Sequence, residues 1–154
     1  MSSTKKTPKS GTKKTIKKHV AAKPTEAPAG SAAVASQKMI LLVEDEAPLA
    51  HALEMKLKND GYGVKTVANG SDALSEAKKG CYSIMLLDLI MPLMDGFSVL
   101  AELKSRKTTL PIIVLSNLGQ EEDRAKAKDL GALDYFVKSN TPISDIIARV
   151  KQVI

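Results

Sequence analysis

Ile84-Met85-Leu86-Leu87-Asp88 is a short apolar run that ends in a carboxylate. A run of this length without polar alternation is typical of a strand that is buried on both faces, as strands are in parallel sheets. The carboxyl ends of such strands form the edge at which open α/β folds bind ligands. Asp88 is therefore a candidate site residue, although an aspartate at a strand end often serves only to begin a turn.

Three more apolar runs also end in polar residues, and a parallel sheet would bring these residues to the same edge. Each of these polar residues, taken alone, could have an ordinary structural role in a solvated turn, at a strand end or as a surface lysine. Their joint occurrence at several strand ends favours a shared functional site instead. The runs and the residues that follow them are Met39–Val43 with Glu44 and Asp45, Pro111–Leu115 with Ser116, and Tyr135–Val137 with Lys138.

From residue 38 onward, strand and helix patterns alternate along the chain. Pro48 suits the first turn of a helix, Ser71 can cap a second helix, and Gly131 suits the position just after a helix end. Five strands that alternate with five helices predict an α/β fold with a doubly wound, five-stranded parallel sheet and right-handed crossovers. The expected strands cover about 39–43, 64–67, 83–88, 111–116 and 134–137.

Residues 1–37 differ in composition from the rest of the chain, being rich in Lys, Ala, Thr, Ser and Pro. They carry eight lysines and one glutamate, a net charge of +7, whereas residues 38–154 carry a net charge of −1. With no aromatic residue and only three larger aliphatics, the segment cannot bury enough apolar surface to offset the entropy cost of ordering. We expect a disordered basic tail, and its composition resembles that of linker-histone tails.

The bulk composition excludes several classes of protein. At 154 residues, the chain can hold one ordinary domain and an appendage. No apolar run approaches the length of about 18 residues that predicts a membrane span, and lysines and prolines interrupt any secretory signal. Cys81 is the only cysteine, so a disulfide framework is excluded and we expect a cytoplasmic protein.

With these residues in place, the chain resembles the receiver domain of two-component response regulators. The resemblance covers residues 38–154 and includes Met91–Gly96, which is similar to the family's loop before its third helix. It implies a flavodoxin-like sheet with strand order 2-1-3-4-5, an order that the alternation of elements does not determine. It also implies phosphorelay signalling, in which a partner histidine kinase or phosphotransfer protein supplies the phosphoryl group.

The resemblance implies a role for each candidate residue. Asp88 would be the phosphoacceptor, because a carboxylate that attacks a phosphoryl group forms an acyl phosphate. Mg²⁺ would neutralise charge on the transferred group. Its ligands would be Asp45, Asp88 and the backbone carbonyl of Ile90, with Glu44 acting through water.

Three more residues would bind the phosphoryl group or respond to it. Lys138 would contribute a fixed positive charge, and Ser116 would donate its hydroxyl to a phosphoryl oxygen. Tyr135 would change rotamer with that hydroxyl, as an aromatic residue at this place often does in the family. The switch would then alter the surface formed by the fourth helix, the fourth and fifth strands, and the fifth helix.

The leading hypothesis is a stand-alone receiver domain that signals to an unidentified downstream protein and turns over no separate substrate. We expect no output domain, since the chain leaves no room for one after Ile154. An enzyme of the haloacid-dehalogenase type fits poorly, because that chemistry needs a second aspartate where Ile90 stands. The alternative is a phosphorylation-gated nucleic-acid-binding protein whose residues 1–37 contact phosphates without reading the base sequence.

Overall fold

Strands and helices alternate through residues 36–154, the part of the chain that the computed structural model describes. The strands are β1 (Met39–Val43), β2 (Gly63–Val67), β3 (Ile84–Asp88), β4 (Ile112–Ser116) and β5 (Asp134–Val137). The helices are α1 (Ala47–Asn59), α2 (Gly70–Ala77), α3 (Gly96–Ser105), α4 (Glu121–Asp129) and α5 (Ile143–Val153). A short 3₁₀ helix, η1 (Lys138–Asn140), follows β5.

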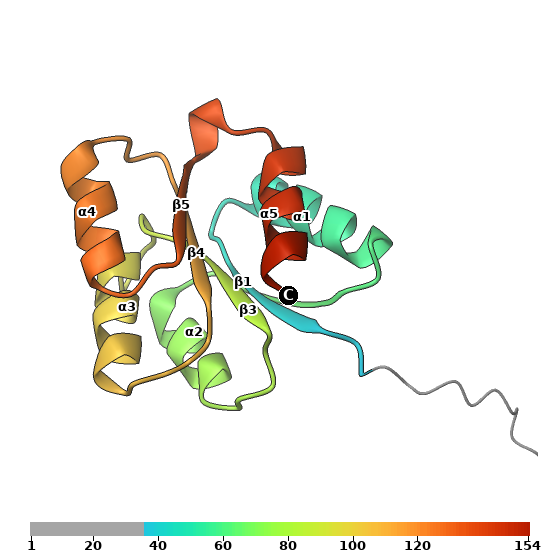
Figure 1. Cartoon of the computed structure of the whole chain (residues 1–154), viewed down its shortest axis with the longest axis horizontal. Helices are drawn as coiled ribbons and strands as arrows, with labels where there is room; N and C mark the ends of the chain where they lie inside the picture. The colour runs from blue at the N-terminus through green and yellow to red at the C-terminus, as the bar shows by residue number, and fades with distance from the viewer. Residues whose placement is uncertain (1–35) are drawn as a thin grey trace, which may run out of the picture. The chain divides into compact units, whose positions relative to one another are not determined.

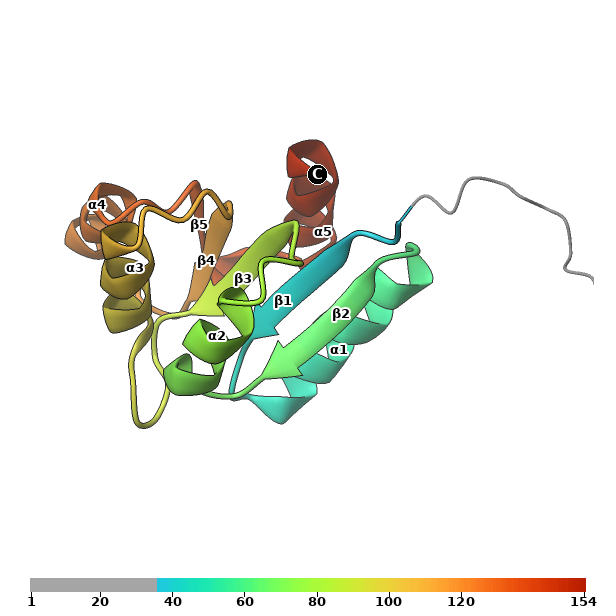
Figure 2. The ribbon, with the colours of Figure 1, turned by 90° about the horizontal axis from the view of Figure 1, so that it is seen from below.

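The five strands are parallel and lie in the order β2-β1-β3-β4-β5 (Figures 1 and 2), which confirms the predicted doubly wound, flavodoxin-like sheet. β3 is the central strand, with β1 and β4 as its neighbours. Because parallel strands all end at the same edge, the residues that follow β1, β3, β4 and β5 come together there. The order of the strands therefore positions the candidate site.

Alternate residues of β1 face opposite sides of the sheet, as the two-residue period of a strand requires. Ile40 and Leu42 belong to an apolar cluster with α1 and α5, whereas Leu41 and Val43 belong to a second cluster with α2, α3 and α4. Figures 1 and 2 show the same two layers of helices on opposite faces of the sheet. Since both faces of the central strands are covered, their sequences are continuously apolar.

The element boundaries confirm most of the predicted signals and correct one of them. α1 begins one residue before Pro48, and Gly131, just after α4, has a φ of 104° in the left-handed region. The prediction that Ser71 caps α2 is wrong. The cap is Asn69, whose side chain accepts a hydrogen bond from the Asp72 N–H at 2.9 Å. Both residue types can cap a helix, so the choice depends on where the helix starts rather than on local preference.

The predicted tail, residues 1–37, lies outside the described residues except for its last two. One of these two, Gln37, donates a side-chain hydrogen bond to the Gly61 carbonyl oxygen at 3.1 Å. Within residues 36–154, none of the helices has the length and apolar character needed to cross a membrane.

Candidate functional site

Asp88 is the last residue of the central strand β3 and is only 2 % exposed. Its Oδ1 accepts a hydrogen bond from the Ile90 N–H at 3.0 Å, and its Oδ2 accepts one from the Lys138 ammonium at 2.8 Å. A buried carboxylate is costly unless it is hydrogen-bonded and paired with a cation. Asp88 meets both conditions, so its carboxylate is kept in one orientation at the carboxyl edge of the sheet.

Glu44 follows β1 directly and is as deeply buried as Asp88. Its Oε1 accepts a hydrogen bond from the Glu46 N–H at 3.1 Å. Its Oε2 lies 2.8 Å from Lys138 Nζ but outside hydrogen-bonding geometry, so it has no hydrogen-bond partner among the described residues. Burial raises the pKa of Glu44; the hydrogen bond from Lys138 opposes this, and the charge of Asp88 adds to it. Glu44 is thus a buried acid with one unsatisfied oxygen.

Lys138, the first residue of η1, brings its ammonium to three of the acids at this edge. Nζ lies 2.8 Å from Asp88 Oδ2, 2.9 Å from Glu44 Oε1 and 3.0 Å from Glu46 Oε1. Burial alone would lower the pKa of Lys138, but these three hydrogen bonds outweigh burial and raise it. Lys138 therefore stays cationic, and one cation among three acids leaves the ionised cluster with a net negative charge.

Ser116, the last residue of β4, is fully buried. Its Oγ accepts a hydrogen bond from the Leu118 N–H at 3.2 Å, and the Leu118 carbonyl oxygen accepts one from the Tyr135 hydroxyl at 2.7 Å. Burial raises the pKa of the Tyr135 phenol, and an interaction with Ser116 acts in the opposite direction. The hydroxyls of Ser116 and Tyr135 are therefore connected through a single residue of the β4–α4 loop.

Three carboxylates at this edge could hold a metal ion. Glu44, Glu46 and Asp88 each place a carboxylate oxygen within 4.8 Å of the others. Mg²⁺ prefers oxygen ligands of this kind, and the unsatisfied Oε2 of Glu44 and the net negative charge of the cluster both fit a hard divalent cation. Asp45, the predicted direct ligand, is exposed and lies outside this cluster.

Glu46 belongs to this site although the sequence analysis did not single it out as a candidate. In the structure it is the N-cap residue of α1, and its side chain reaches the Lys138 ammonium. The sequence did contain one indication of where Glu46 lies, since Glu46 directly precedes the helix start that Pro48 marks. A residue there must lie beside the end of β1.

The loop from Asp88 to α3 presents apolar side chains to solvent beside the site. Ile90 is 52 % exposed and Leu93 is 92 % exposed. The Met94 N–H donates to the Pro92 carbonyl oxygen at 2.8 Å, which places Leu93, with a φ of 71°, at the centre of a strained γ-turn. The backbone itself therefore keeps Leu93 turned outward.

Gly96 begins α3 and brings the helix against the end of β3. A Cβ atom at this position would lie 2.4 Å from the Asp88 carbonyl oxygen and 2.7 Å from Leu89 Cα, both of which are backbone atoms. Asp95, one residue earlier, caps the helix by accepting a hydrogen bond from the Ser98 N–H at 3.0 Å. The start of α3 is thus fixed against the phosphoacceptor candidate by a residue that has no side chain.

Fold and site together define an α/β domain that carries a buried acid cluster and a lysine at the carboxyl edge of a five-stranded parallel sheet. Residues 40–151 match the family model described as the response regulator receiver domain. The chain therefore belongs to the receiver domains of two-component response regulators, which act in phosphorelay signalling. This confirms the resemblance that the sequence motifs indicated.

Curated relatives agree with this assignment. The "Probable transcriptional regulator ycf27" of Pyropia yezoensis is 39 % identical over 118 residues, which cover 77 % of this chain and 48 % of the relative. The transcriptional regulatory protein ResD of Bacillus subtilis is 35 % identical over 116 residues, which cover 75 % of this chain and 48 % of that protein. The chain thus spans about half the length of the curated relatives that it matches.

Solved structures show the same fold. The receiver domain of the Francisella response regulator 1452 matches with a TM-score of 0.72 and 26 % identity, over 76 % of this chain and 96 % of that one. The Vibrio cholerae chemotaxis protein CheY4 matches with a TM-score of 0.70 and 26 % identity, over 77 % of this chain and 100 % of that one. One of these structures is a response regulator receiver domain, and the other is a chemotaxis protein.

Proposed function

We propose that this receiver accepts a phosphoryl group on Asp88 from a phosphohistidine of a partner histidine kinase or phosphotransfer protein. The observation that carries the proposal is the buried Asp88 carboxylate, which is held between the Ile90 N–H and the Lys138 ammonium. In the step itself, an Asp88 oxygen attacks phosphorus, a P–O bond forms and the P–N bond to the donor imidazole breaks. The imidazole leaves with the electron pair and takes up a proton from solvent.

Phosphoryl transfer asks a protein mainly for positioning and for positive charge on the transferred group. Lys138 already contacts Asp88 at 2.8 Å, so its ammonium lies beside the oxygen to which the phosphoryl group becomes attached. The Ile90 N–H keeps the other carboxylate oxygen in place. Both contacts exist before a donor arrives, and the site therefore needs little rearrangement for the attack.

The cluster of Glu44, Glu46 and Asp88 would attract Mg²⁺. The direct ligands that the family resemblance implies are Asp45, Asp88 and the Ile90 carbonyl, with Glu44 acting through water. The unsatisfied Oε2 of Glu44 supports the placing of a water or cation at this acid. Asp45 is exposed and lies outside the cluster, so binding of the ion would require its side chain to move toward Asp88. When bound, the ion would neutralise charge on the phosphoryl oxygens.

Ser116 would bind the new phosphoryl group and start the conformational switch. Its Oγ accepts the Leu118 N–H, so its own O–H is available to donate to a phosphoryl oxygen. Movement of Ser116 pulls on Leu118, whose carbonyl oxygen accepts the Tyr135 hydroxyl. The rotamer change of Tyr135 then alters the surface around α4 and β5, which a downstream protein would recognise.

In this proposal the chain is a cytoplasmic signalling protein that modifies itself and turns over no separate substrate. The alternative of a nucleic-acid-binding function concerns residues 1–37, which lie almost wholly outside the described residues, and no observation favours it.

Labelling with a small phosphodonor tests the proposal. We expect the full-length protein to gain one phosphoryl group from acetyl phosphate in the presence of Mg²⁺, measured by intact mass, and none in EDTA. Asp88→Asn should gain none, whereas Asp95→Asn, a change to another aspartate near the same loop, should label like the wild type. Labelling that persists in Asp88→Asn, or that does not need metal, would rule out Asp88 as the phosphoacceptor.

A further inference from the structure

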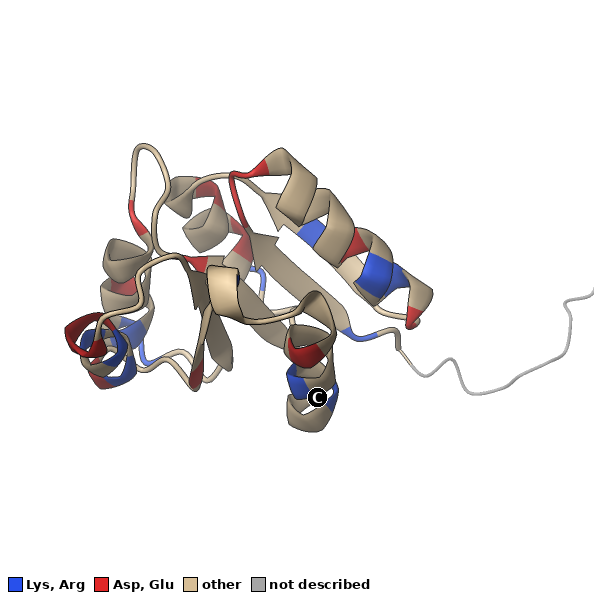
Figure 3. Ribbon diagram, turned by 90° about the horizontal axis from the view of Figure 1, so that it is seen from above, with Lys and Arg blue, Asp and Glu red and all other residues tan. Residues whose placement is uncertain are grey.

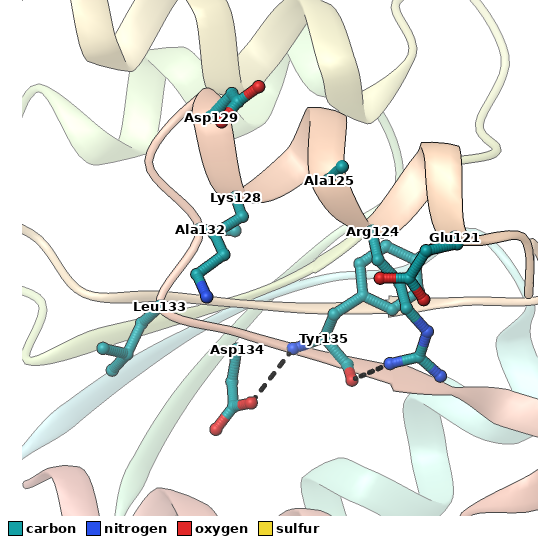
Figure 4. Close-up of a pocket in the computed structure, with 9 residues that line it drawn as sticks. All are labelled: Glu121, Arg124, Ala125, Lys128, Asp129, Ala132, Leu133, Asp134 and Tyr135. Carbon is teal, nitrogen blue, oxygen red and sulfur yellow. Dashed lines mark hydrogen bonds between the residues drawn. The ribbon is translucent and has the colours of Figure 1, made fainter.

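Arg124 of α4 contacts Tyr135 of β5 in two ways. Its guanidinium carbon lies 5.2 Å from the centroid of the Tyr135 ring, and its Nη1 donates to the Tyr135 carbonyl oxygen at 3.4 Å. Figure 4 shows the Arg124 side chain extending from the helix to Tyr135, with the hydrogen bond drawn as a dashed line. Arg124 therefore contacts both the ring and the backbone of the same residue.

The backbone contact matters because β5 is an edge strand. Among residues 36–154, β4 is its only neighbour in the sheet, so the outward backbone groups of β5 need side chains or water as partners. The Tyr135 carbonyl oxygen accepts from Arg124, and the Tyr135 N–H donates to Asp134 Oδ1 at 3.3 Å. Both backbone groups of Tyr135 are therefore hydrogen-bonded to side chains. Of these two side chains, that of Arg124 comes from α4.

The hydroxyl group of Tyr135 is connected to Ser116 of the candidate site through Leu118. This hydroxyl donates to the Leu118 carbonyl oxygen at 2.7 Å, and the Leu118 N–H donates to Ser116 Oγ at 3.2 Å. A continuous path of contacts thus runs from Arg124 through Tyr135 and Leu118 to Ser116. Each step is a hydrogen bond or a cation–ring contact, so a change at one end has a physical route to the other.

α4 has few other attachments that could fix its position. Ala127 is its only buried residue. Lys126 also lies over an aromatic ring, with its Nζ 4.1 Å from the centroid of Phe97 in α3. Cation–ring contacts thus contribute to holding α4, and the contact of Arg124 is the one that reaches the strand carrying Tyr135.

We infer that Arg124 is a positioning residue that holds Tyr135 in its Leu118-bonded conformation and couples α4 to the Ser116 hydroxyl. The inference concerns the regulation of the proposed phosphoacceptor site and rests on that proposed function for its signalling consequence. Its structural part, the dependence of Tyr135 on Arg124, does not need phosphorylation. Loss of a partly buried cation–ring contact should shift the ratio of the two Tyr135 conformers by about fivefold.

Fluorine NMR can observe Tyr135 directly, because the chain has three tyrosines and no tryptophan. Full-length protein labelled with 3-fluorotyrosine should give three signals from the folded state, and Tyr135→Phe identifies the signal of Tyr135. In metal-free protein, Arg124→Ala should move or split this signal and leave the signals of Tyr62 and Tyr82 in place. Arg124→Lys, which keeps a cation, should restore most of the wild-type position.

Arg106→Ala is the matched control, because Arg106 pairs with Glu102 of α3 at 2.7 Å and this ion pair is not part of the path from Arg124 to Ser116. This variant should leave the Tyr135 signal unchanged. An unchanged Tyr135 signal in folded Arg124→Ala would overturn the inference, as would an equal shift in Arg106→Ala. If Arg124→Ala does not fold, Arg124→Gln takes its place in the same comparison, with the same expected and contradicting results.

A second measurement separates this inference from the proposed function. After treatment with acetyl phosphate and Mg²⁺, the Tyr135 signal should move in the wild type and move less in Arg124→Ala, at equal labelling of Asp88. If Asp88 is not labelled in either protein, the proposed function fails while the metal-free spectra still decide the role of Arg124. Equal movement of the Tyr135 signal in both labelled proteins would overturn the coupling to Ser116.

Discussion

α4 and α5 flank the same edge strand, β5, on opposite faces of the sheet, but they are attached in different ways. α5 buries Ile146, Ile147 and Val150 in the core, and its apolar residues lie along one face. α4 buries only Ala127. Its sequence begins with three acidic residues, which are followed by three basic residues separated by alanines. Figure 3 shows this crowding of acidic and basic residues on α4, at the left of the view.

The difference shows that one sheet can carry both a fixed helix and a displaceable one. Helices in proteins owe most of their stability to burial of an apolar face, and α4 has almost none. Polar and cation–ring contacts such as those of Arg124 and Lys126 are individually weak and easily exchanged. We therefore expect α4 to open locally at a lower free energy than α5, as elements that move in switches do.

The strongest test of the comparison is truncation of a core residue of α5. Ile147 is 3 % exposed, so Ile147→Ala should lower the free energy of unfolding by about 2–5 kcal/mol, through lost burial and a residual cavity. Urea unfolding followed by circular dichroism measures this change. Leu133→Ala, which truncates a residue that is 47 % exposed beside α4, is the control and should cost much less. Equal losses of unfolding free energy in the two variants would show that α5 is not attached more strongly than α4.

A second test enlarges the only buried residue of α4. Ala127 is fully buried, so Ala127→Leu should push the helix away from the sheet and cost about 1–3 kcal/mol through overpacking. Hydrogen exchange should become faster in α4 and stay unchanged in α5. Ala125→Leu, at an exposed position of the same helix, is the control. If α5 loses protection to the same extent as α4, the two helices behave as one cooperative unit.

A smaller effect is expected at the helix starts. Asp95 caps α3, whereas Gln120 makes no side-chain cap bond at the start of α4. Asp95→Ala should therefore cost about 0.5–2 kcal/mol at pH 7, and Gln120→Ala close to nothing. Thermal or urea unfolding of both variants measures the difference between the two helix starts.

The cost of Asp95→Ala should depend on pH. Partial burial would raise the pKa of Asp95, but the hydrogen bonds from Ser98 outweigh it and lower the pKa below the ordinary value of 3.8. A lowered folded-state pKa adds stability above the unfolded-state pKa, and this stability is lost as the pH falls through the folded-state pKa. The difference between wild type and Asp95→Ala should accordingly shrink below about pH 4. A difference that is constant from pH 7 to pH 2.5 would show that the charge of Asp95 contributes nothing.

The fold could be predicted from the sequence because the strands are short, continuous apolar runs. Runs such as Ile84–Leu87 and Ile112–Leu115 are typical of strands that are covered on both faces in a parallel sheet, and both strands are fully buried there. The strand order required the family resemblance, since an alternation of strands and helices is compatible with several orders. The cap of α2 was misassigned because Asn69 and Ser71 are equally suitable by local chemistry.

The candidate site was predictable as far as it depends on strand ends. Glu44, Asp88, Ser116 and Lys138 each follow or end a strand, and the sheet brings them together. Glu46 and Arg124 could not be found in this way, because neither is the first residue after a strand and their contacts depend on how the starts of α1 and α4 pack against the sheet. The contact of Glu46 with Lys138 spans 92 residues, so the position of Glu46 before α1 indicates where this acid lies but not which cation it meets.

Gly96 has a consequence for how such chains tolerate change over evolution. It carries no chemical group, yet a methyl group in its place would collide with the carbonyl of Asp88. A descendant with alanine here would keep every acid, the serine and the lysine, and a motif search would count it as intact. Its third strand and third helix would nonetheless be forced apart, so a receiver domain can lose the geometry of its candidate site through a substitution that leaves all of the site's polar residues untouched.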